Sequence, residues 1–427
     1  MSDDTRGEVP QLPEPADDNV PAETLPGTGD GGSGGGDEQG NGRKFFEDLT
    51  GVNVDWRNAL LVPILAIITA LIASAFVILI SDLDVWSNFG TESLSNAFSE
   101  IRRAFVALFE GSLGSGRALS ETLTNSSTLI LAGLSVAVGF RAGLFNIGTE
   151  GQILAGGMAA VWAGFAFDFP VFIHLPLVII AGAIGGAVWG GIPGLLRAKT
   201  GAHEVITTIM MNQIAILLVL YLLDTQLFQL AGRDDPVSKT IKESGRLPRL
   251  VGFLDNSDYR VHAGLILALL AAAAVYWLLF RSTIGYEYRA VGANPDAARY
   301  GGMSVTRIYI SVMSVAGALG GLAAVDLMSG VLHRASPGFS GGLGFEAIAL
   351  ALLGRSHPGG VVVAGLLFGA LRTGGQEMQV ATDVPIDLIL VVQALVVGFI
   401  AAPALIRAIY RVRTGEGTGQ VTRGWAT

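Results

Sequence analysis

The chain has 427 residues, of which 51% are hydrophobic and 15% are charged, and its formal net charge is −9. Soluble domains carry about 25% charged residues, so this composition excludes an ordinary soluble protein and favours an integral membrane protein. Cysteine is absent, which excludes disulfides and thiolate metal sites. The histidines form no closely spaced pair, and no GxxxxGK(S/T) phosphate loop occurs. We therefore expect no metal, no cofactor and no ATPase site on this chain.

Residues 1–43 form a stretch rich in glycine and proline, with ten acidic and two basic residues. Its net charge is −8, which leaves −1 for the remainder, so the acidity of the chain belongs to this stretch. Such a composition predicts a disordered segment. The first apolar run begins only near Asn58, which argues against a signal peptide. Arg43, Lys44 and Arg57 precede that run, so we expect a cytoplasmic tail.

Apolar runs long enough to cross about 30 Å of hydrocarbon recur along the chain. They are continuous rather than alternating, which favours helices over a barrel. We therefore predict an all-α integral membrane protein, a polytopic bundle of about ten transmembrane helices. The expected spans, two of them short, are 58–80, 121–140, 150–168, 172–196, 204–228, 262–280, 304–327, 343–354, 359–373 and 385–407. Positive charge from Arg407 onward predicts a cytoplasmic C-terminus as well.

These patterns divide the chain into four expected regions. They are a disordered acidic tail over 1–43, a first span with an interfacial segment over 44–120, a transmembrane domain over 121–407 and a cytoplasmic tail over 408–427. Residues 101–109 are amphipathic, so we expect them to lie along the outer interface. The longest internal polar loop, 229–261, is expected outside. The arginine-containing interruption at 281–302 is expected in the cytoplasm.

Two stretches in opposite halves of the chain interrupt the apolar pattern with glycines and one acidic residue. The first runs from Gly143 to Gly151 and contains Glu150, and the second begins at Gly341 and contains Glu346. Paired interruptions of this kind indicate a transport pathway. An ionised glutamate in mid-membrane is costly. Each glutamate therefore lines a wet cavity, or offsets the dipole of its own helix from the first turn, and the two interpretations are compatible.

A third polar cluster begins at His203. At helical spacing Glu204, Thr208 and Asn212 share one face. Their polar groups either bind a neighbouring helix or contact a substrate, and the sequence leaves both open. Small residues recur at 182–186, 190–194 and 317–323, which predicts close helix packing.

The interruption at 281–302 contains the signature of a miniature helix from Pro295 to Tyr300. Asn294 is a good N-cap and Pro295 suits the first helical position. Gly301 is expected to end the helix in a left-handed conformation, and Gly292 with Gly301-Gly302 to act as hinges. Ala297 and Ala298 keep the surface low. The helix is either an ordinary capped turn or a peg that docks with a cytoplasmic partner.

Four stretches together resemble the permease subunits of bacterial ATP-binding-cassette (ABC) importers for nucleosides, within the wider ribose and simple-sugar permease group. They are Gly143-Leu-Phe-Asn-Ile-Gly-Thr-Glu-Gly-Gln152, Glu204-Val-Ile-Thr-Thr-Ile-Met-Met-Asn212, Val291-Gly-Ala-Asn-Pro-Asp-Ala-Ala-Arg-Tyr-Gly-Gly302 and Gly344-Phe-Glu-Ala-Ile-Ala-Leu-Ala-Leu-Leu-Gly354. The resemblance covers about 120–405.

The resemblance implies a bacterial plasma-membrane protein that pairs with a second permease, as a homodimer or heterodimer, to form one pathway in the lipid bilayer. It also implies cytoplasmic ATP-binding subunits and an external substrate-binding lipoprotein. No feature predicts a nucleic acid polymer as partner. Carried over by position, the ATPase contact would be formed by Asn294, Pro295, Asp296, Ala297, Ala298, Tyr300 and Gly301.

The expected substrate pathway follows the polar interruptions and a possible aromatic partner for a base. Its predicted residues are Phe145, Asn146, Thr149, Glu150, Gln152, Glu204, Thr208, Asn212, Phe345 and Glu346. A permease for simple sugars such as pentoses is the nearest alternative to a nucleoside permease. A stand-alone proton- or ion-coupled carrier that uses Glu150 and Glu346 is an alternative of a different class.

Overall fold

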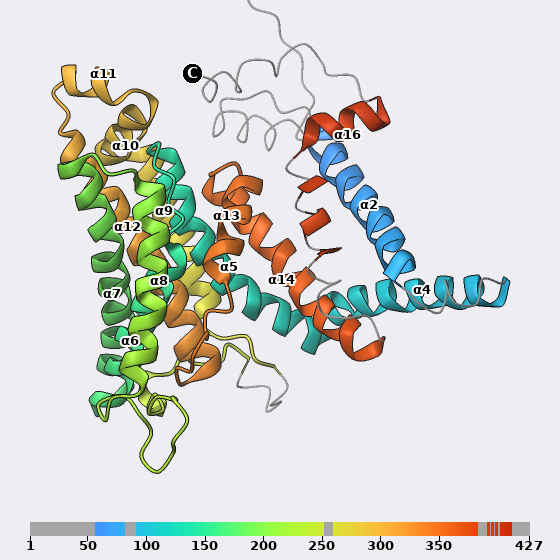
Figure 1. The fold of residues 1–427 in the computed structure, drawn as a ribbon, viewed down its shortest axis with the longest axis horizontal. Helices are drawn as coiled ribbons and strands as arrows, with labels where there is room; N and C mark the ends of the chain where they lie inside the picture. The colour runs from blue at the N-terminus through green and yellow to red at the C-terminus, as the bar shows by residue number, and fades with distance from the viewer. Residues whose placement is uncertain are drawn as a thin grey trace, which may run out of the picture. The chain divides into compact units, whose positions relative to one another are not determined.

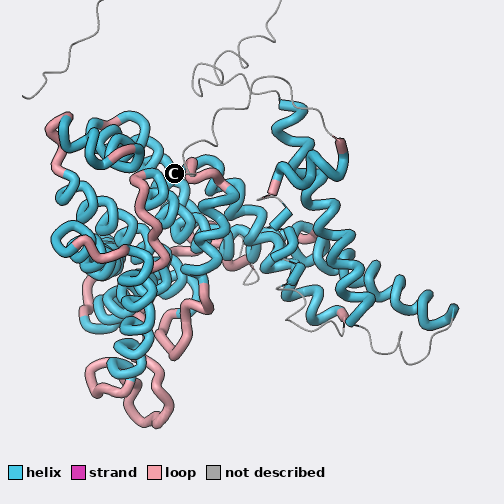
Figure 2. Tube along the Cα trace, turned by 45° about the horizontal axis from the view of Figure 1, so that its top comes forward, coloured by secondary structure: helices cyan, strands magenta, loops and turns pink. Residues whose placement is uncertain are grey.

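The structure is a computed structural model that describes residues 56–81, 91–251, 259–382, 391–392, 394–396, 398–399 and 402–411. The chain divides into two units, Met1–Asp55 and Trp56–Thr427. All described residues belong to the second unit, so the predicted acidic tail lies outside them. Their regular structure is helical, with two isolated β-bridges in the connections (Figures 1 and 2).

Helices occupy nine of the ten predicted spans. They are α2 (Trp56–Ser81), α5 (Gly116–Arg141), α6 (Thr149–Ala166), α7 (Val171–Thr200), α8 (Glu204–Leu223), α9 (Gly264–Arg281), α12 (Val305–Leu327), α13 (Leu343–Leu353) and α14 (Pro358–Ala381). Three predicted ends were wrong by five residues or more, since α5 begins five residues early, α8 ends five residues early and α14 extends eight residues further than expected. The tenth span, 385–407, is described only at 391–392, 394–396, 398–399 and 402–407, and the last of these stretches contains the start of the short helix α16 (Pro403–Tyr410).

Five of the described helices are long and apolar enough to cross a bilayer, namely α5, α7, α8, α9 and α12 with the π-helical turn η3 (Met328–Leu332). In contrast, α13 has 11 residues, and at 1.5 Å per residue it rises only about 16 Å. It therefore cannot cross about 30 Å of hydrocarbon alone. The fold is a membrane-spanning helical bundle, and the count of ten spans remains a prediction.

The helix α5 is the centre of the bundle. Of its most apolar 18-residue window 89% is buried, whereas the corresponding share is 22% for both α7 and α8. Serines and threonines line the first half of α5 and aliphatic residues the second, and nearly all are enclosed. The exposed faces of α7 and α8 are apolar, with residues such as Phe172, Ile184 and Leu217. These two helices therefore suit the periphery, where hydrocarbon or another chain covers them.

Small residues bring α7 and α12 into backbone contact, as the small-residue patterns predicted. A Cβ atom at Gly186 would overlap the carbonyl oxygen of Gly317, and one at Gly321 would overlap that of Gly182. Because Gly182 and Gly186 are four residues apart, they lie on one face of α7. This confirms close packing through small residues.

The predicted amphipathic piece at 101–109 lies within a longer helix, α4 (Thr91–Leu113). Its buried side chains, Ile101, Ala104 and Leu108, pack with Leu371 and Met378 of α14. Arg102 and Arg103 point away and are exposed. The amphipathic pattern therefore reflects packing on α14, and the location of α4 at the outer interface remains a prediction.

Candidate translocation and coupling sites

The first interrupted segment returns the chain into the bundle between α5 and α6. Gly143 has a φ of 70° and touches the backbone of Gly292, where any Cβ atom would be too close. Asn146 is fully buried, and its Oδ1 accepts from the Gly148 amide at 3.0 Å and from Gln152 Nε2 at 3.3 Å. Its Nδ2 lies 3.4 Å from Thr149 Oγ1. Three predicted pathway residues, Asn146, Thr149 and Gln152, thus form one buried hydrogen-bonded cluster.

The helix α8 supports this segment through Asn212. The Asn212 Oδ1 accepts from the Gly151 amide at 2.8 Å, and its Nδ2 donates to the Ile147 carbonyl oxygen at 2.9 Å. One turn earlier, Thr208 is fully buried and donates to the Glu204 carbonyl oxygen at 2.7 Å. The Asn212 side chain therefore binds the backbone of the first interrupted segment, and the Thr208 hydroxyl binds the backbone of α8 itself.

Glu150 joins the two interrupted segments, although it belongs to the first turn of α6. It is 4% exposed. Its Oε2 accepts from the Gly344 amide at 2.8 Å, and its Oε1 accepts from the Ser340 hydroxyl. Gly344 stands in the first turn of α13, where amides have no helical partner. Glu150 therefore caps α13, a helix from the opposite half of the chain, rather than acting only on its own helix.

The second interrupted segment is more open than the first. Gly341 and Gly342 have φ values of 56° and 78°, which turn the chain into α13. Phe345 is 53% exposed. The Glu346 carboxylate forms an ion pair with Arg372 of α14 at 3.4 Å, and the two side chains are 29% and 30% exposed. Phe145, the corresponding aromatic residue of the first segment, instead packs on Phe140 with 4.9 Å between ring centroids.

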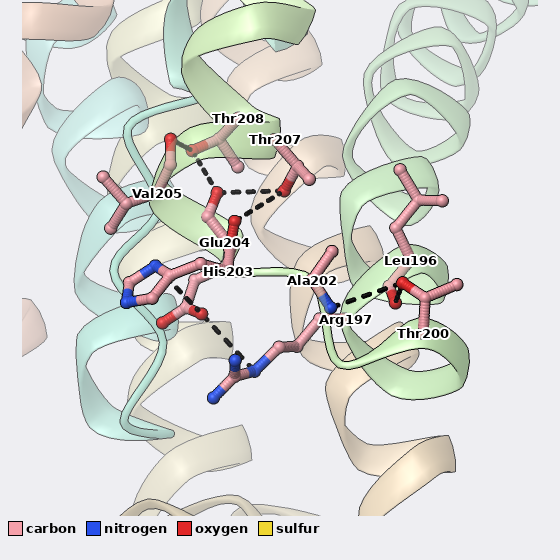
Figure 3. Close-up of polar contacts among 9 residues, drawn as sticks. All are labelled: Leu196, Arg197, Thr200, Ala202, His203, Glu204, Val205, Thr207 and Thr208. Atoms are coloured by element: carbon pink, nitrogen blue, oxygen red, sulfur yellow. Dashed lines mark hydrogen bonds and ion pairs between the residues drawn. The ribbon is translucent and has the colours of Figure 1, made fainter.

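The Glu204 side chain, at the start of α8, has no contact with the side chain of another predicted pathway residue among the described bonds. Figure 3 shows the Arg197 guanidinium directed at its carboxylate, with Nε and Oε2 3.4 Å apart. The His203 ring lies on the other side, with 3.8 Å between Nδ1 and the same oxygen. Arg197 comes from the last turn of α7, so this group holds the α7–α8 connection together. It contains no contact to the first or second interrupted segment among the bonds described.

The interruption at 281–302 folds into α10 (Thr283–Ala293) and α11 (Pro295–Tyr300), and α11 has the predicted bounds. The Asn294 Oδ1 accepts from the amides of Asp296 and Ala297, both at 3.0 Å, which confirms the predicted cap. Tyr300 is 95% exposed at the tip. Figure 1 shows α11 projecting at one end of the bundle.

Three details of this interruption differ from the prediction. Gly301 has a φ of −73°, and the left-handed residue is Gly302 with a φ of 83°. Ala298 is buried on the bundle and Met303 donates to its carbonyl oxygen at 3.0 Å, so Ala298 anchors α11 and offers no surface to a partner. Gly292 lies inside α10 against the backbone of residues 141–143, so it is a packing point and not a hinge.

Two cavities accompany these sites. One of about 460 Å³ lies among α6, α7 and α8 and is almost entirely apolar, with Met158, Trp162 and Leu218 in its wall. The other, of about 410 Å³, adjoins α11 and is polar, with Tyr286, Glu287 and Arg307 in its wall. Neither is lined by a predicted pathway residue. The second cavity makes the surface around α11 concave as well as polar, which suits docking of another protein.

Comparison with known sequences identifies the family. Residues 118–403 match the family described as branched-chain amino acid transport system / permease component. The chain belongs to this permease family. The match covers the bundle from α5 to the start of α16 and includes both interrupted segments and α11.

Several related permeases are similar over most of their length. The chain is 41% identical to the guanosine ABC transporter permease protein NupP of Bacillus subtilis, over 82% of this chain and 95% of that protein. It is 39% identical to the nucleoside ABC transporter permease protein NupB of Lactococcus lactis, over 71% and 84%. It is 37% identical to the glucose ABC transporter permease protein TsgB13 of Haloferax volcanii, over 72% and 82%. No solved structure matches the chain. The predicted resemblance to ABC permeases is confirmed, and the chain is a transport subunit.

The sequence alone did not indicate the polar groups that complete these sites in the permease. Ser340 binds Glu150, and Arg372 pairs with Glu346, but neither stands within a recognisable motif. Asp326, which is fully buried in α12, was not among the predicted site residues either. For Asp326 and Arg372 the sequence did contain a signal, because each is a charged residue inside an otherwise apolar predicted span, a combination that is rare and often functional.

Proposed function

We propose that this permease forms, with a second permease chain, the pathway of an importer for nucleosides that is driven by ATP hydrolysis on separate subunits. The names of NupP and NupB, at 41% and 39% identity, support this substrate class. TsgB13 at 37% supports a simple sugar as the second candidate. A nucleoside contains a pentose, so one site with hydroxyl-binding groups is compatible with either class.

The observation that carries the pathway proposal is the partly exposed group of Phe345, Glu346 and Arg372. Glu346 stands in the first turn of α13, a helix within the part of the bundle that the family match covers. A charged group within a membrane-spanning bundle faces an aqueous cavity or a protein partner rather than lipid. We infer that this face of α13 lines the pathway once the second chain is present.

The chemistry of this face suits a nucleoside. A carboxylate accepts hydrogen bonds from ribose hydroxyls and a guanidinium donates to ring nitrogens or carbonyl oxygens. The exposed Phe345 ring can stack on a base. The other predicted pathway residues, from Phe145 to Gln152 and on α8, are proposed to support this face indirectly, because their polar groups bind within the chain.

The distribution of charge supports a cytoplasmic position for α11. The connections and helix ends at the end of the bundle that carries α10, α11 and α16 contain, among the described residues, ten basic and three acidic side chains. An excess of lysine and arginine marks cytoplasmic loops. Both chain ends are then cytoplasmic, in a bacterial plasma membrane. In this proposal the described parts of the connection between α8 and α9, 224–251 and 259–263, face outward, toward an external substrate-binding lipoprotein.

The proposed ATPase contact is the exposed side of α11 with the polar cavity beside it. Its residues are Asn294, Pro295, Asp296, Ala297, Tyr300 and Gly301, with Ala298 holding the helix from below. The second permease is either an identical or a different chain. When the ATP-binding subunits close, we expect them to move α11 and the adjoining α10. Because Gly292 of α10 lies against the backbone of residues 141–143, this movement would reach the start of the first interrupted segment.

Copurification in mild detergent tests the ATPase contact. We expect Asp296→Lys to weaken association with the ATP-binding subunit at least tenfold. Gly302→Val should act similarly, because a branched side chain is strained at its φ of 83°. Asp168→Lys is the matched control, since it makes the same change at an exposed site on the opposite end. Equal loss in both lysine variants, or in neither, would contradict the proposed contact.

Uptake by the assembled transporter tests the substrate class. Vesicles that contain this permease, its second permease chain and the ATP-binding subunits, supplied with the substrate-binding lipoprotein, should accumulate labelled guanosine, and unlabelled nucleosides should compete more strongly than glucose or pentoses. The reverse order would favour the sugar alternative. Vesicles that contain this chain alone should not accumulate solute under an imposed proton gradient. Uptake there would instead support a stand-alone carrier.

A further inference from the structure

The carboxyl group of Asp326 is enclosed between α12 and α5. Asp326 is fully buried, and its Oδ2 lies 2.7 Å from the Ser127 Oγ and 2.6 Å from the Thr128 Oγ1. The Ser127 hydroxyl is also 2.8 Å from the Thr124 carbonyl oxygen, which can only accept. Because a hydroxyl has one proton, Ser127 cannot donate to both. If it donates to Thr124, the proton in its contact with Asp326 must come from the carboxyl group.

The other carboxyl oxygen has no hydrogen-bond donor. Asp326 Oδ1 has no hydrogen-bond partner among the described residues, and His262 Nδ1 lies 3.6 Å from it. That nitrogen accepts from the Gly264 amide at 3.2 Å, so it presents a lone pair and no proton. Gly264 lets the carboxyl group come this close, since a Cβ atom there would overlap Oδ1. An ionised carboxylate would therefore face a second acceptor.

The surrounding charges do not neutralise an ionised Asp326. Its ion-pair partner among the described residues is His262, which is 1% exposed. Burial, and secondarily the charge of Arg260, lower the pKa of His262 against the opposing effect of Asp326. Arg260 is itself paired with Glu121 at 3.4 Å. Burial, and secondarily the charges of Arg246 and Arg249, lower the pKa of the neighbouring His333. Because His262 Nδ1 accepts from the Gly264 amide, the ring has no proton on the nitrogen that faces Asp326.

We infer that Asp326 retains a proton in this conformation, so that the bundle contains a buried proton-binding site at the junction of α5, α9 and α12. A neutral carboxyl group can donate to Ser127 and accept from Thr128, which leaves no net charge in the apolar interior. An ionised one would need several donors or a cation, as buried charges generally do. This site is separate from the proposed substrate and ATPase contacts and does not depend on them.

The site also suggests what Asp326 does. Asp326 lies in the last turn of α12, two residues before the π-helical turn η3, and π-helical turns are frequent at functional sites. From η3 the chain runs directly to the second interrupted segment. The His262 ring lies against Gly330 of η3, and the Leu247 amide donates to the Ser329 carbonyl oxygen at 3.0 Å. Asp326 is therefore a positioning residue, which holds the end of α12 on α5 through Ser127 and Thr128.

Infrared difference spectroscopy on the full-length protein tests the protonation directly. We expect the carbonyl stretch of a protonated carboxyl group near neutral pH, shifted by deuterium exchange and absent in Asp326→Asn. Glu121→Gln, which changes a partly exposed acid of α5, the helix that carries Ser127 and Thr128, is the control and should leave the band intact. A wild-type spectrum with no such band, or a band that survives in Asp326→Asn, would overturn the inference.

The pH dependence of thermal unfolding distinguishes a proton site from a merely structural residue. A carboxyl group that is protonated when folded and ionised when unfolded makes folding take up one proton. Its share of the folding equilibrium constant then falls about tenfold for each pH unit of increase until the folded group itself ionises. We expect this slope in the wild type and its loss in Asp326→Asn, which should still fold. If Asp326→Asn fails to fold while Asp326→Glu is tolerated, a charged carboxylate is required and the inference is wrong.

Discussion

Glu150 and Glu346 each stand in the first turn of a helix that follows a glycine-rich stretch, yet the protein surrounds them differently. Glu150 is enclosed and both of its oxygens accept hydrogen bonds from the segment around α13. Glu346 is partly exposed and has one partner, Arg372. The first segment therefore stabilises the bundle through Glu150, whereas the second presents a partly exposed polar surface at Glu346. Substitutions in the first segment should change stability, and substitutions in the second should change transport.

The largest effect is expected at Gly344, where the two segments touch. A methyl group at this position would overlap the amide nitrogen and Cα of Glu150, and backbone cannot move aside as a flexible side chain can. We expect Gly344→Ala to destabilise the protein by about 3 kcal/mol, the upper end of the usual range for overpacking. Thermal unfolding in detergent measures the effect.

Gly359→Ala is the control, because a Cβ atom there makes ordinary contacts of 3.4 and 3.5 Å with the His357 ring. It should unfold like the wild type. A melting temperature of Gly344→Ala that equals that of the control would show that the two segments are not held in contact as described.

A smaller loss of stability is expected for Glu150→Ala. The substitution would leave the Gly344 amide and the Ser340 hydroxyl without their acceptor in a buried site. An unpaired buried group costs about 1–3 kcal/mol, so we expect a loss of about 2 kcal/mol. Glu150→Gln retains one acceptor oxygen and should recover part of it. Comparable destabilisation by Glu346→Ala would contradict the conclusion that only Glu150 stabilises the contact between the two segments.

How much of this arrangement the sequence predicts depends on how local its causes are. The helix Pro295–Tyr300 was predicted with its bounds because Asn294 and Pro295 specify a start by themselves. The continuous apolar runs similarly indicated most spans. The partner of Glu150 was beyond reach, since Gly344 is 194 residues away in sequence. The burial of Ala298 and the backbone contact of Gly292 likewise depend on which helices pack together, and no nearby residue specifies that.

Transport, rather than stability, should respond to the second segment. If Glu346 faces the pathway, Glu346→Gln keeps the size of the side chain but removes the charge that the proposed hydroxyl contacts would use. A hydrogen bond to a charged group contributes about 1.5–3 kcal/mol, so we expect guanosine uptake to fall at least tenfold with an unchanged melting temperature. Arg372→Lys retains a positive charge but lacks the planar guanidinium group. Its guanosine uptake should lie between that of the wild type and that of Glu346→Gln. Unchanged uptake in Glu346→Gln would remove this face from the pathway.

The smallest effect concerns the turn that ends the second segment, between α13 and α14. His357 caps α14, because its Nδ1 accepts from the Gly359 amide at 3.2 Å. Burial, and secondarily the charge of Arg141, lower the pKa of His357 from its usual value of 6.5. A lowered folded-state pKa means that the folded protein favours the neutral ring. This contribution to stability is fully present above pH 6.5 and is lost as the pH falls through the folded-state pKa.

Protonation of Nδ1 would also remove the acceptor that caps the helix. Because the ring is only partly enclosed and solvent screens its charge, we expect less than about 1 kcal/mol of destabilisation, the usual worth of a cap, between pH 7 and pH 5. His357→Asn supplies a cap that does not titrate in this range. The variant should therefore unfold at the same temperature as the wild type at pH 7 and at a slightly higher temperature at pH 5. Parallel pH profiles for the two proteins would show that protonation of His357 does not weaken the cap of α14.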